Sequence, residues 1–310
     1  MFLKKPKFWD NKGYNFISVF LLPFTLITSF INWTKIFHEK KKFKIKTICI
    51  GNIYIGGTGK TPLCIETFHI LKKLRFRPVF IKKYYSNQKD EIELLSKNGP
   101  VISLNSRKKS LEIAETKKYD FAIIDDGLQD KTIDYDLKVL CFDKKNFTGN
   151  GKLIPAGPLR EKLNAVKDCH LAFFNGPHST KNRFKSILKK KRKDIQIFET
   201  EPKLSKIENL KKKNSYVIFS GIGNPKNFEF LLKKNKYKIL ESFEFPDHYN
   251  FKDEDIREIS ISAKKNNSTL LTTEKDFYRL KKNQKKNIKK INIKLKINNI
   301  KRYTEILKKI

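Results

Sequence analysis

The chain is poor in sulphur and in acidic side chains. Its 310 residues include one methionine and four isolated cysteines, with no C-x-x-C pair, so we expect reduced thiols in the core of a cytosolic protein. Acidic residues number 32 against 68 lysines and arginines, a formal net charge of +36. That surplus is typical of a surface for anionic partners, although a lysine-rich composition alone would also produce it. No aromatic–basic RNA- or DNA-binding module is present, so we expect no nucleic acid partner.

Charge is absent altogether from Gly13 to Thr34, a stretch of 22 residues. As one helix it would be about 33 Å long, near the hydrocarbon thickness of a bilayer. Lysines flank both ends, Trp9 and Trp33 stand where interfacial aromatic residues belong, and Pro23 would kink the helix. We expect residues 1–40 to form a membrane-associated apolar helix that lies on or spans the membrane. The alternative is a buried core helix.

Glycines gather in the stretch TICIGNIYIGGTGKTP, residues 47–62. The pattern predicts a buried strand, a turn and the start of a helix, in which bare backbone N–H groups close around a phosphate. Lys60 would place a positive charge on the β- and γ-phosphates of a nucleotide, and the Thr61 hydroxyl would ligate Mg²⁺. Tyr54 stands where the full phosphate-loop pattern has glycine, so a glycine-rich turn without nucleotide is the alternative. The residues predicted to bind the nucleotide are Gly56, Gly57, Thr58, Gly59, Lys60 and Thr61.

Strands and helices alternate after this loop. Strands are predicted at 78–81, 101–104, 119–124 and 137–142, and helices at 62–74, 92–96 and 106–116. This alternation predicts an α/β fold, a P-loop NTPase-like and mostly parallel sheet flanked by helices. Ligands of such sheets bind beyond the carboxyl ends of the strands, where the phosphate loop, Asp90 and the pair Asp125-Asp126 should converge. Asp125-Asp126 would hold Mg²⁺ opposite Thr61, with a solvated D-D-G turn as the alternative.

The sequence pattern changes in the second half of the chain. Lysine runs at 189–193 and 211–213 precede a new series of predicted strands, near 216–220, 237–245, 268–273 and 291–297, with helices between them. We therefore predict three parts: a membrane-associated segment at 1–40, a P-loop kinase core at 41–205 and a smaller C-terminal α/β domain at 206–310.

Two loops carry further candidates. The first, residues 149–161, is GNGKLIPAGPLRE, in which three glycines and two prolines favour a rigid conformation. It ends in Arg160 and Glu161, which either clamp a phosphate or form an ion pair at a helix start. In the second loop, His248 follows a strand and adjoins Asp247, where a catalytic and a structural role are both open.

Taken together, these motifs resemble those of the tetraacyldisaccharide 4'-kinase family of lipid A biosynthesis. The matching motifs, in the same order and spacing from Phe8-Trp9 to Asp276, are GNIYIGGTGKTP, DDGLQ, GNGKLIPAGPLRE, the FPDHY loop and TEKD. The resemblance implies phosphoryl transfer from ATP to the 4'-hydroxyl of a tetraacylated glucosamine disaccharide 1-phosphate. It also implies a location at the cytoplasmic face of the inner membrane.

Residue roles follow from the same resemblance. It assigns the phosphate loop to residues 56–61 and the metal to Thr61, Asp125 and Asp126. It makes Asp90 the proton acceptor, supported by His248. The residues that it places near the lipid substrate are Glu91, Arg160, Glu161 and Asn224.

The chain departs from the family pattern at two places. The Arg-Gly-Tyr of the family appears as Lys83-Tyr84-Tyr85, with a short loop from there to Asp90, and the histidine after D-D-G-L-Q is Asp130. A rival function is a membrane-associated P-loop ATPase that acts on a protein partner, which would explain the phosphate loop, Asp125-Asp126 and the anchor. It would leave PAGPLRE and the placement of Asp90 and His248 unexplained. A nucleotide-binding scaffold without enzymatic activity is a more remote alternative.

Overall fold

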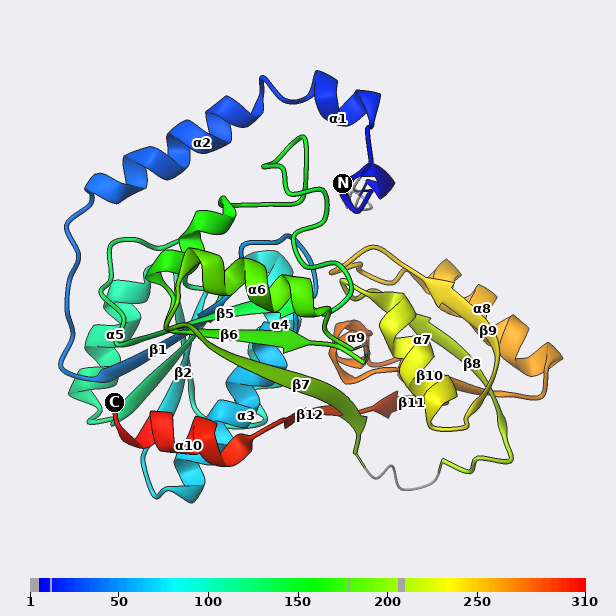
Figure 1. Ribbon diagram of the computed structural model, residues 1–310. Coiled ribbons are helices and arrows are strands. Elements are labelled where there is room, and N and C mark those ends of the chain that lie inside the picture. The colour runs from blue at the N-terminus through cyan, green and yellow to red at the C-terminus, as the bar shows by residue number, and fades with distance from the viewer. Residues whose placement is uncertain (1–5, 12, 178, 206–209) are drawn as a thin grey trace.

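A computed structural model describes residues 6–11, 13–177, 179–205 and 210–310. Runs of buried apolar residues form an eight-stranded sheet in the order β12-β7-β6-β5-β1-β4-β2-β3 (Figure 1). All neighbours pair in parallel except β12 and β7, which pair antiparallel. The strands are β1 (Lys46–Gly51), β2 (Pro78–Lys83), β3 (Val101–Leu104), β4 (Phe121–Asp125), β5 (Leu137–Asp143), β6 (Leu171–Asn175), β7 (Gln196–Leu204) and β12 (Ile293–Ile297).

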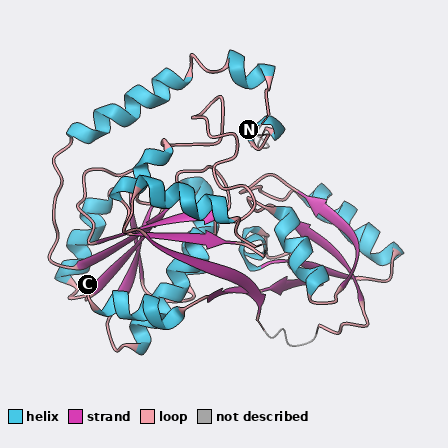
Figure 2. Cartoon of the chain, viewed as in Figure 1, coloured by secondary structure: helices cyan, strands magenta, loops and turns pink. Residues whose placement is uncertain are grey.

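Helices cover both faces of this sheet, as expected for parallel strands that are apolar on both sides (Figure 2). One face carries α3 (Lys60–Lys73), α4 (Lys89–Ser96) and α10 (Ile300–Lys308). The other carries α5 (Arg107–Thr116), the 3-10 helix η4 (Leu163–Asp168) and α6 (Asn182–Lys191). The predicted α/β class, a mostly parallel sheet flanked by helices, is confirmed.

A second, smaller sheet has four parallel strands in the order β11-β10-β8-β9. They are β8 (Ser215–Ser220), β9 (Lys238–Glu244), β10 (Thr269–Thr273) and β11 (Ile288–Ile291). α7 (Pro225–Lys234) packs on one face and α8 (Asp253–Lys265) on the other, while the short α9 (Glu274–Arg279) follows β10.

The last residues of the chain return to the first domain. β12 pairs with β7, and α10 buries Tyr303 and Leu307 in the same core cluster as α3. The structure therefore differs from the predicted domain 206–310 at its C-terminal end, because 293–310 belong to the large sheet. The alternating residues 291–297 are also divided between two strands, one in each sheet.

The N-terminal segment does not form the single apolar helix that the sequence predicted. It forms α1 (Phe16–Phe20) and α2 (Thr25–Thr34), separated by a turn at 21–24 that contains Pro23. Proline lacks the N–H that a continuous helix would need there. Within the described residues, no helix combines the length and the apolar character needed to cross a membrane. The buried core helix is also wrong, because α1 and α2 arch over the rest of the chain with most of their large apolar side chains exposed (Figure 1).

Candidate active site

The phosphate loop lies at the carboxyl end of the central strand β1 and runs from Asn52 to Gly59, directly before α3. Gly56 (φ 122°) and Gly59 (φ 78°) have backbone conformations that residues with a side chain rarely adopt. A Cβ atom at Gly59 would also lie 2.8 Å from Nδ2 of Asn175. Asn175 is buried and donates a hydrogen bond to the carbonyl of Thr58. The loop thus presents bare backbone at a helix N-terminus, the arrangement that an anion requires.

Asp125 ends β4 beside this loop and is fully buried. The hydroxyl of Thr61 and the ammonium of Lys82 lie 3.0 and 3.1 Å from the same oxygen, Oδ2. The other oxygen, Oδ1, is buried without a hydrogen-bond partner. Because a buried acceptor is rarely left unpaired, and oxygen is the donor that Mg²⁺ prefers, Thr61 and Asp125 fit a magnesium ion. The described residues contain no group of three or more His, Cys, Asp or Glu side chains able to hold a metal, so phosphates and water would complete the shell.

Asp126 is engaged differently from Asp125. Its backbone has φ 60°, and both carboxylate oxygens lie 3.0 Å from Nη1 of Arg160. Nζ of Lys60 is 3.8 Å from Oδ1. Burial alone would raise the pKa of Asp126, but Lys60 and Arg160 outweigh it and hold the pKa well below its ordinary value. Asp126 is therefore a charged anchor for two cations and fits the metal role less well than Asp125.

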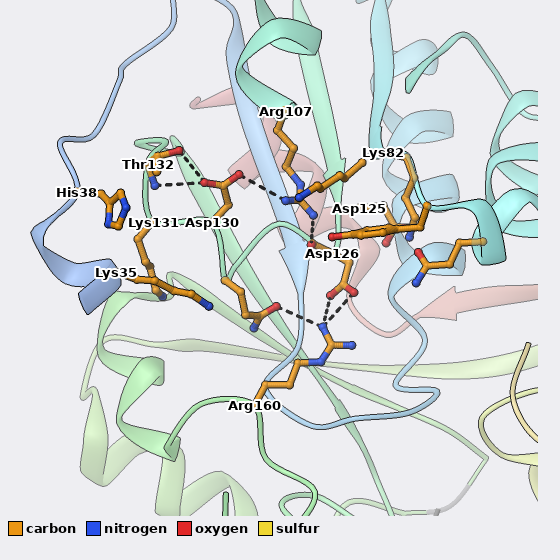
Figure 3. Close-up of a pocket in the computed structure, with 14 residues that line it drawn as sticks. Lys35, His38, Lys82, Arg107, Asp125, Asp126, Asp130, Lys131, Thr132 and Arg160 are labelled. Carbon is orange, nitrogen blue, oxygen red and sulfur yellow. Dashed lines mark hydrogen bonds and ion pairs between the residues drawn. The ribbon is translucent and has the colours of Figure 1, made fainter. Parts of the chain in front are cut away.

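The loop that ends in Arg160 and Glu161 is fixed by its backbone and by side chains. The N–H of Arg160 donates to the carbonyl of Ile53 at 2.7 Å, next to the phosphate loop. Glu161 is nearly buried and accepts from Gln129 at 3.1 Å and from Lys131 at 3.0 Å. Arg160 therefore lies beside Asp126, as Figure 3 shows, while Glu161 contacts Gln129 and Lys131.

A cavity of about 440 Å³ opens next to these residues (Figure 3). Lys35 and His38 line it from the N-terminal segment, and Arg107 and Arg160 line it from the core. The positively charged lining residues are Lys35, Lys82, Lys83, Arg107, Lys131 and Arg160, against Asp125, Asp126 and Asp130. Such a surplus suits an anionic ligand.

The two departures from the family pattern both line this cavity. Lys83 and Tyr85 contribute on one side. Asp130 lies 3.4 Å from Nη1 of Arg107, whose Nη2 donates to the carbonyl of Asp126 at 2.7 Å. Asp130 is therefore an ion-pair partner of Arg107.

A second cluster of charges joins the two domains. Asp90 and Glu91 stand in the first turn of α4 and face His248, Lys275 and Arg279 of the smaller domain. Nδ1 of His248 lies 3.5 Å from Oδ1 of Asp90 and has no hydrogen-bond partner among the described residues, so the two side chains are adjacent without a hydrogen bond. Nζ of Lys275 lies 2.9 Å from Glu91 and 3.5 Å from Nε2 of His248. The structure thus places Asp90 and His248 next to each other, from two different domains.

The charges in this cluster fix the protonation states of its carboxyl groups. Burial would raise the pKa of Asp90, but His248, Lys275 and Arg279 outweigh it and hold the pKa well below its ordinary value. The pKa of Glu91 is also lowered, because Lys275 and Lys82 outweigh its burial. Both groups are therefore carboxylates at neutral pH.

Asn224 lies at the start of α7, where its side chain accepts a hydrogen bond from the N–H of Asn227. It is a helix cap in this structure. Its neighbour Gly223 packs on the phosphate loop, since a Cβ at Gly223 would lie 2.2 Å from the nitrogen of Gly57. The glycine turn of the smaller domain therefore sits directly on the predicted nucleotide site.

Sequence reasoning missed several charged residues of the site, among them Lys82, Lys275 and Arg279. Lys82 is almost fully buried and connects Asp125 with Glu91. Lys275 lies within the T-E-K-D motif, so the sequence does contain a signal for this residue. Nothing in the local sequence distinguishes Arg279 or Lys82 from the many other basic side chains.

Comparisons with known proteins agree with this geometry. A family model described as tetraacyldisaccharide-1-P 4'-kinase matches residues 16–310. The chain is 45% identical over 313 residues to the tetraacyldisaccharide 4'-kinase of Pelagibacter ubique, covering 100% of this chain and 99% of that protein. It is 34% identical over 293 residues to that of Rickettsia bellii, covering 89% of each.

A solved structure shares the fold. It is a crystal structure of LpxK from Aquifex aeolicus, described as an apo form in complex with ATP. The TM-score is 0.70 at 24% identity, with 94% of this chain and 99% of that chain covered.

Proposed function

The chain belongs to the tetraacyldisaccharide-1-phosphate 4'-kinase family, and from that premise we propose how its residues carry out the reaction. It is a kinase of lipid A biosynthesis that transfers a phosphoryl group from ATP to the 4'-hydroxyl of a tetraacylated disaccharide 1-phosphate. The cationic cavity beside Asp125 and Asp126 supports this function best. A P-loop ATPase acting on a protein would not need a cationic cavity for an anionic ligand at this position.

The phosphate loop binds ATP in this proposal. Backbone N–H groups at residues 56–61 hold the phosphates, and Lys60 neutralises charge that spreads over the transferring group. Thr61 and Asp125 would hold Mg²⁺, which would supply positive charge to neutralise the phosphates. Arg160 keeps Asp126 and Lys60 in place around them through the contacts described above.

Asp90 accepts the proton of the sugar hydroxyl. It is a carboxylate at neutral pH, and His248 lies beside its Oδ1. Lys82 links Glu91, the neighbour of Asp90, to Asp125. The proton-accepting carboxylate and the metal site are therefore parts of one connected set of charges. Because the two halves of the cluster come from different domains, closure around the substrate would exclude water from it.

The N-terminal segment has the exposed apolar side chains that a lipid substrate would require. Ser18, Thr28 and Asn32 donate hydrogen bonds of 2.6–2.7 Å to backbone carbonyls of the loop 150–160. The large apolar side chains point away from these contacts and are exposed: Phe16, Phe20, Leu26, Ile27, Phe30, Ile31, Trp33 and Phe37. A helical segment whose polar side chains contact the protein and whose apolar side chains face outward is suited to lie in a membrane interface. We propose that this segment rests on the cytoplasmic face of the inner membrane and holds the acyl chains near the cavity.

Vesicle binding tests the membrane part of the proposal. Replacing Phe20 and Phe30 by serine should abolish sedimentation with anionic phospholipid vesicles, because the exposed apolar area that inserts is lost. Phe230→Ser is the matched control, since Phe230 is exposed on the smaller domain. Unchanged sedimentation of the Phe20/Phe30 variant would refute this membrane contact.

ATP consumption tests the function against its rival. Purified protein should consume ATP only when a lipid disaccharide 1-phosphate is added. Omitting the 1-phosphate from the acceptor should raise KM, because the cationic cavity loses its partner. Rapid ATP turnover without any lipid acceptor would favour the ATPase instead.

A further inference from the structure

We propose that Arg279 is the positioning residue of Asp90: it occupies one carboxylate oxygen, Oδ2, and leaves the other, Oδ1, free to accept the proton of the sugar hydroxyl. The inference rests on the proposed function, in which Asp90 is the proton acceptor. It assigns a task to a side chain of the smaller domain that no sequence motif above had singled out.

The contacts define which oxygen is taken. Nε and Nη2 of Arg279 lie 2.9 and 2.6 Å from Oδ2 of Asp90. Both side chains are almost completely buried, at 5% and 3% exposure. Two N–H groups on one oxygen fix the carboxylate plane, which a single flexible contact would not do. The imidazole of His248 lies 3.5 Å from Oδ1.

Arg279 is itself fixed by hydrogen bonds from its other guanidinium nitrogen. Its Nη1 donates to the carboxylate of Asp276 at 2.8 Å and to the carbonyl of Gly221. Asp276 is fully buried and is bonded to Thr273, at the start of α9. A guanidinium fixed on both sides loses little further freedom when Asp90 docks against it. The Asp90–Arg279 pair is therefore a buried, preorganised contact between the domains, unlike an exposed ion pair.

The other groups around Asp90 do not duplicate this contact. Lys275 is 3.7 Å from Oδ2, beyond hydrogen-bond distance, and is bonded to Glu91 instead. Glu91, next to Asp90 on α4, pairs with Lys82 and Lys275. Of the groups that contact Asp90 in the described residues, Arg279 is thus the one that sets the direction of its carboxylate.

The proposal has two measurable consequences. Without Arg279 the carboxylate rotates freely, so fewer encounters place Oδ1 against the hydroxyl and kcat falls. The cation that favours the ionised form of Asp90 is also lost, so its pKa rises. The acid limb of the pH–rate profile should therefore move to higher pH. A residue that only stabilised the fold would not move that limb.

The experiment compares Arg279→Lys, Arg279→Met and Arg279→Gln with the wild type, using labelled transfer to the lipid acceptor from about pH 3, below the ordinary aspartate pKa of 3.8, to about pH 9. We expect Arg279→Met and Arg279→Gln to lower kcat by about 10–100-fold, with KM for ATP within about twofold and the acid limb shifted upward. Arg279→Lys keeps the charge but loses the fork, so it should retain the wild-type acid limb at reduced kcat. Added guanidinium should restore part of the rate of Arg279→Met.

Controls separate the inference from its premise. Arg257→Met, at an exposed position on α8, should behave as wild type. Asp90→Asn should lower transfer by about 10²-fold or more, as is expected for Asp90→Ala. If it does not, the proposed role of Asp90 fails whatever Arg279 does. If Asp90→Asn is inactive while folded Arg279→Met and Arg279→Gln keep the wild-type kcat and acid limb, the inference about Arg279 is wrong and the proposed function stands.

Discussion

Replacing Lys82 by methionine should destabilise the protein far more than the loss of an exposed lysine such as Lys281. Lys82 is 2% exposed, and its Nζ lies between Asp125 and Glu91. Methionine fills a similar volume but removes the cation, which leaves two buried carboxylates without their shared partner. Breaking a buried ion pair on one side costs about 3–5 kcal/mol, a large part of a typical stability of about 5–15 kcal/mol.

The pH dependence of this loss follows from Glu91. Its pKa is lowered in the folded protein, so its stabilising contribution is present above its ordinary value of 4.5 and is lost as the pH falls below it. Removing Lys82 raises the pKa of Glu91 in the folded state. The variant's deficit should then shrink on acidification, because protonation of Glu91 removes a buried charge that has lost one of its two lysine partners.

Urea unfolding at about pH 7 and at about pH 4, which lies below the ordinary pKa of 4.5, measures both effects. Lys82→Met should have the larger deficit at pH 7, and the double variant Lys82→Met/Glu91→Gln should recover part of it. Lys281→Met is the control, because Lys281 is exposed in its pair with Asp253. A deficit below about 1 kcal/mol for Lys82→Met at pH 7, or one that grows on acidification, would refute the reasoning.

Three further predictions concern catalysis. Gly59→Ala should weaken ATP binding at least 10-fold, measured by calorimetry, because of its φ of 78° and the 2.8 Å approach to Asn175; wild-type affinity would show that the loop does not bind the phosphates. Lys60→Ala should lower phosphoryl transfer by about 10²-fold or more while the thermal unfolding temperature hardly changes; near wild-type transfer would contradict its role. Asp90→Ala and His248→Ala should each lower single-turnover transfer by about 10²-fold with ATP binding little changed, and the double variant should be scarcely worse than the poorer single; multiplicative losses would separate the two residues.

The sequence predicted those parts of the fold whose signal is local. Apolar runs such as Phe121–Asp125 gave the strands, and glycines gave the phosphate loop. β6 and β7 went unpredicted. β7 is partly exposed along its length, and its partner β12 lies some 90 residues away in the sequence. Pairing between such distant strands cannot be detected in a short window of sequence. Pro23 was recognised, but that it would divide the apolar stretch into two helices depended on contacts with the loop 150–160.

The residues of the site could likewise be predicted only where their signal is local. Residues at strand ends, such as Asp125, could be placed because parallel strands share one edge of a sheet. Arg279 could not, because its contact with Asp90 depends on how two domains meet. Lys82 is one of 68 basic residues, and local sequence does not tell a buried lysine from an exposed one.

Transfer of label to the lipid is the most direct test of the central claim. The purified chain is mixed with γ-labelled ATP, Mg²⁺ and a tetraacylated disaccharide 1-phosphate in detergent micelles, and the lipid product is isolated and its phosphates located by NMR. The proposed function predicts one new phosphate, at the 4'-position, which is absent with Lys60→Ala. Label that appears as free phosphate while the lipid stays unmodified would contradict it.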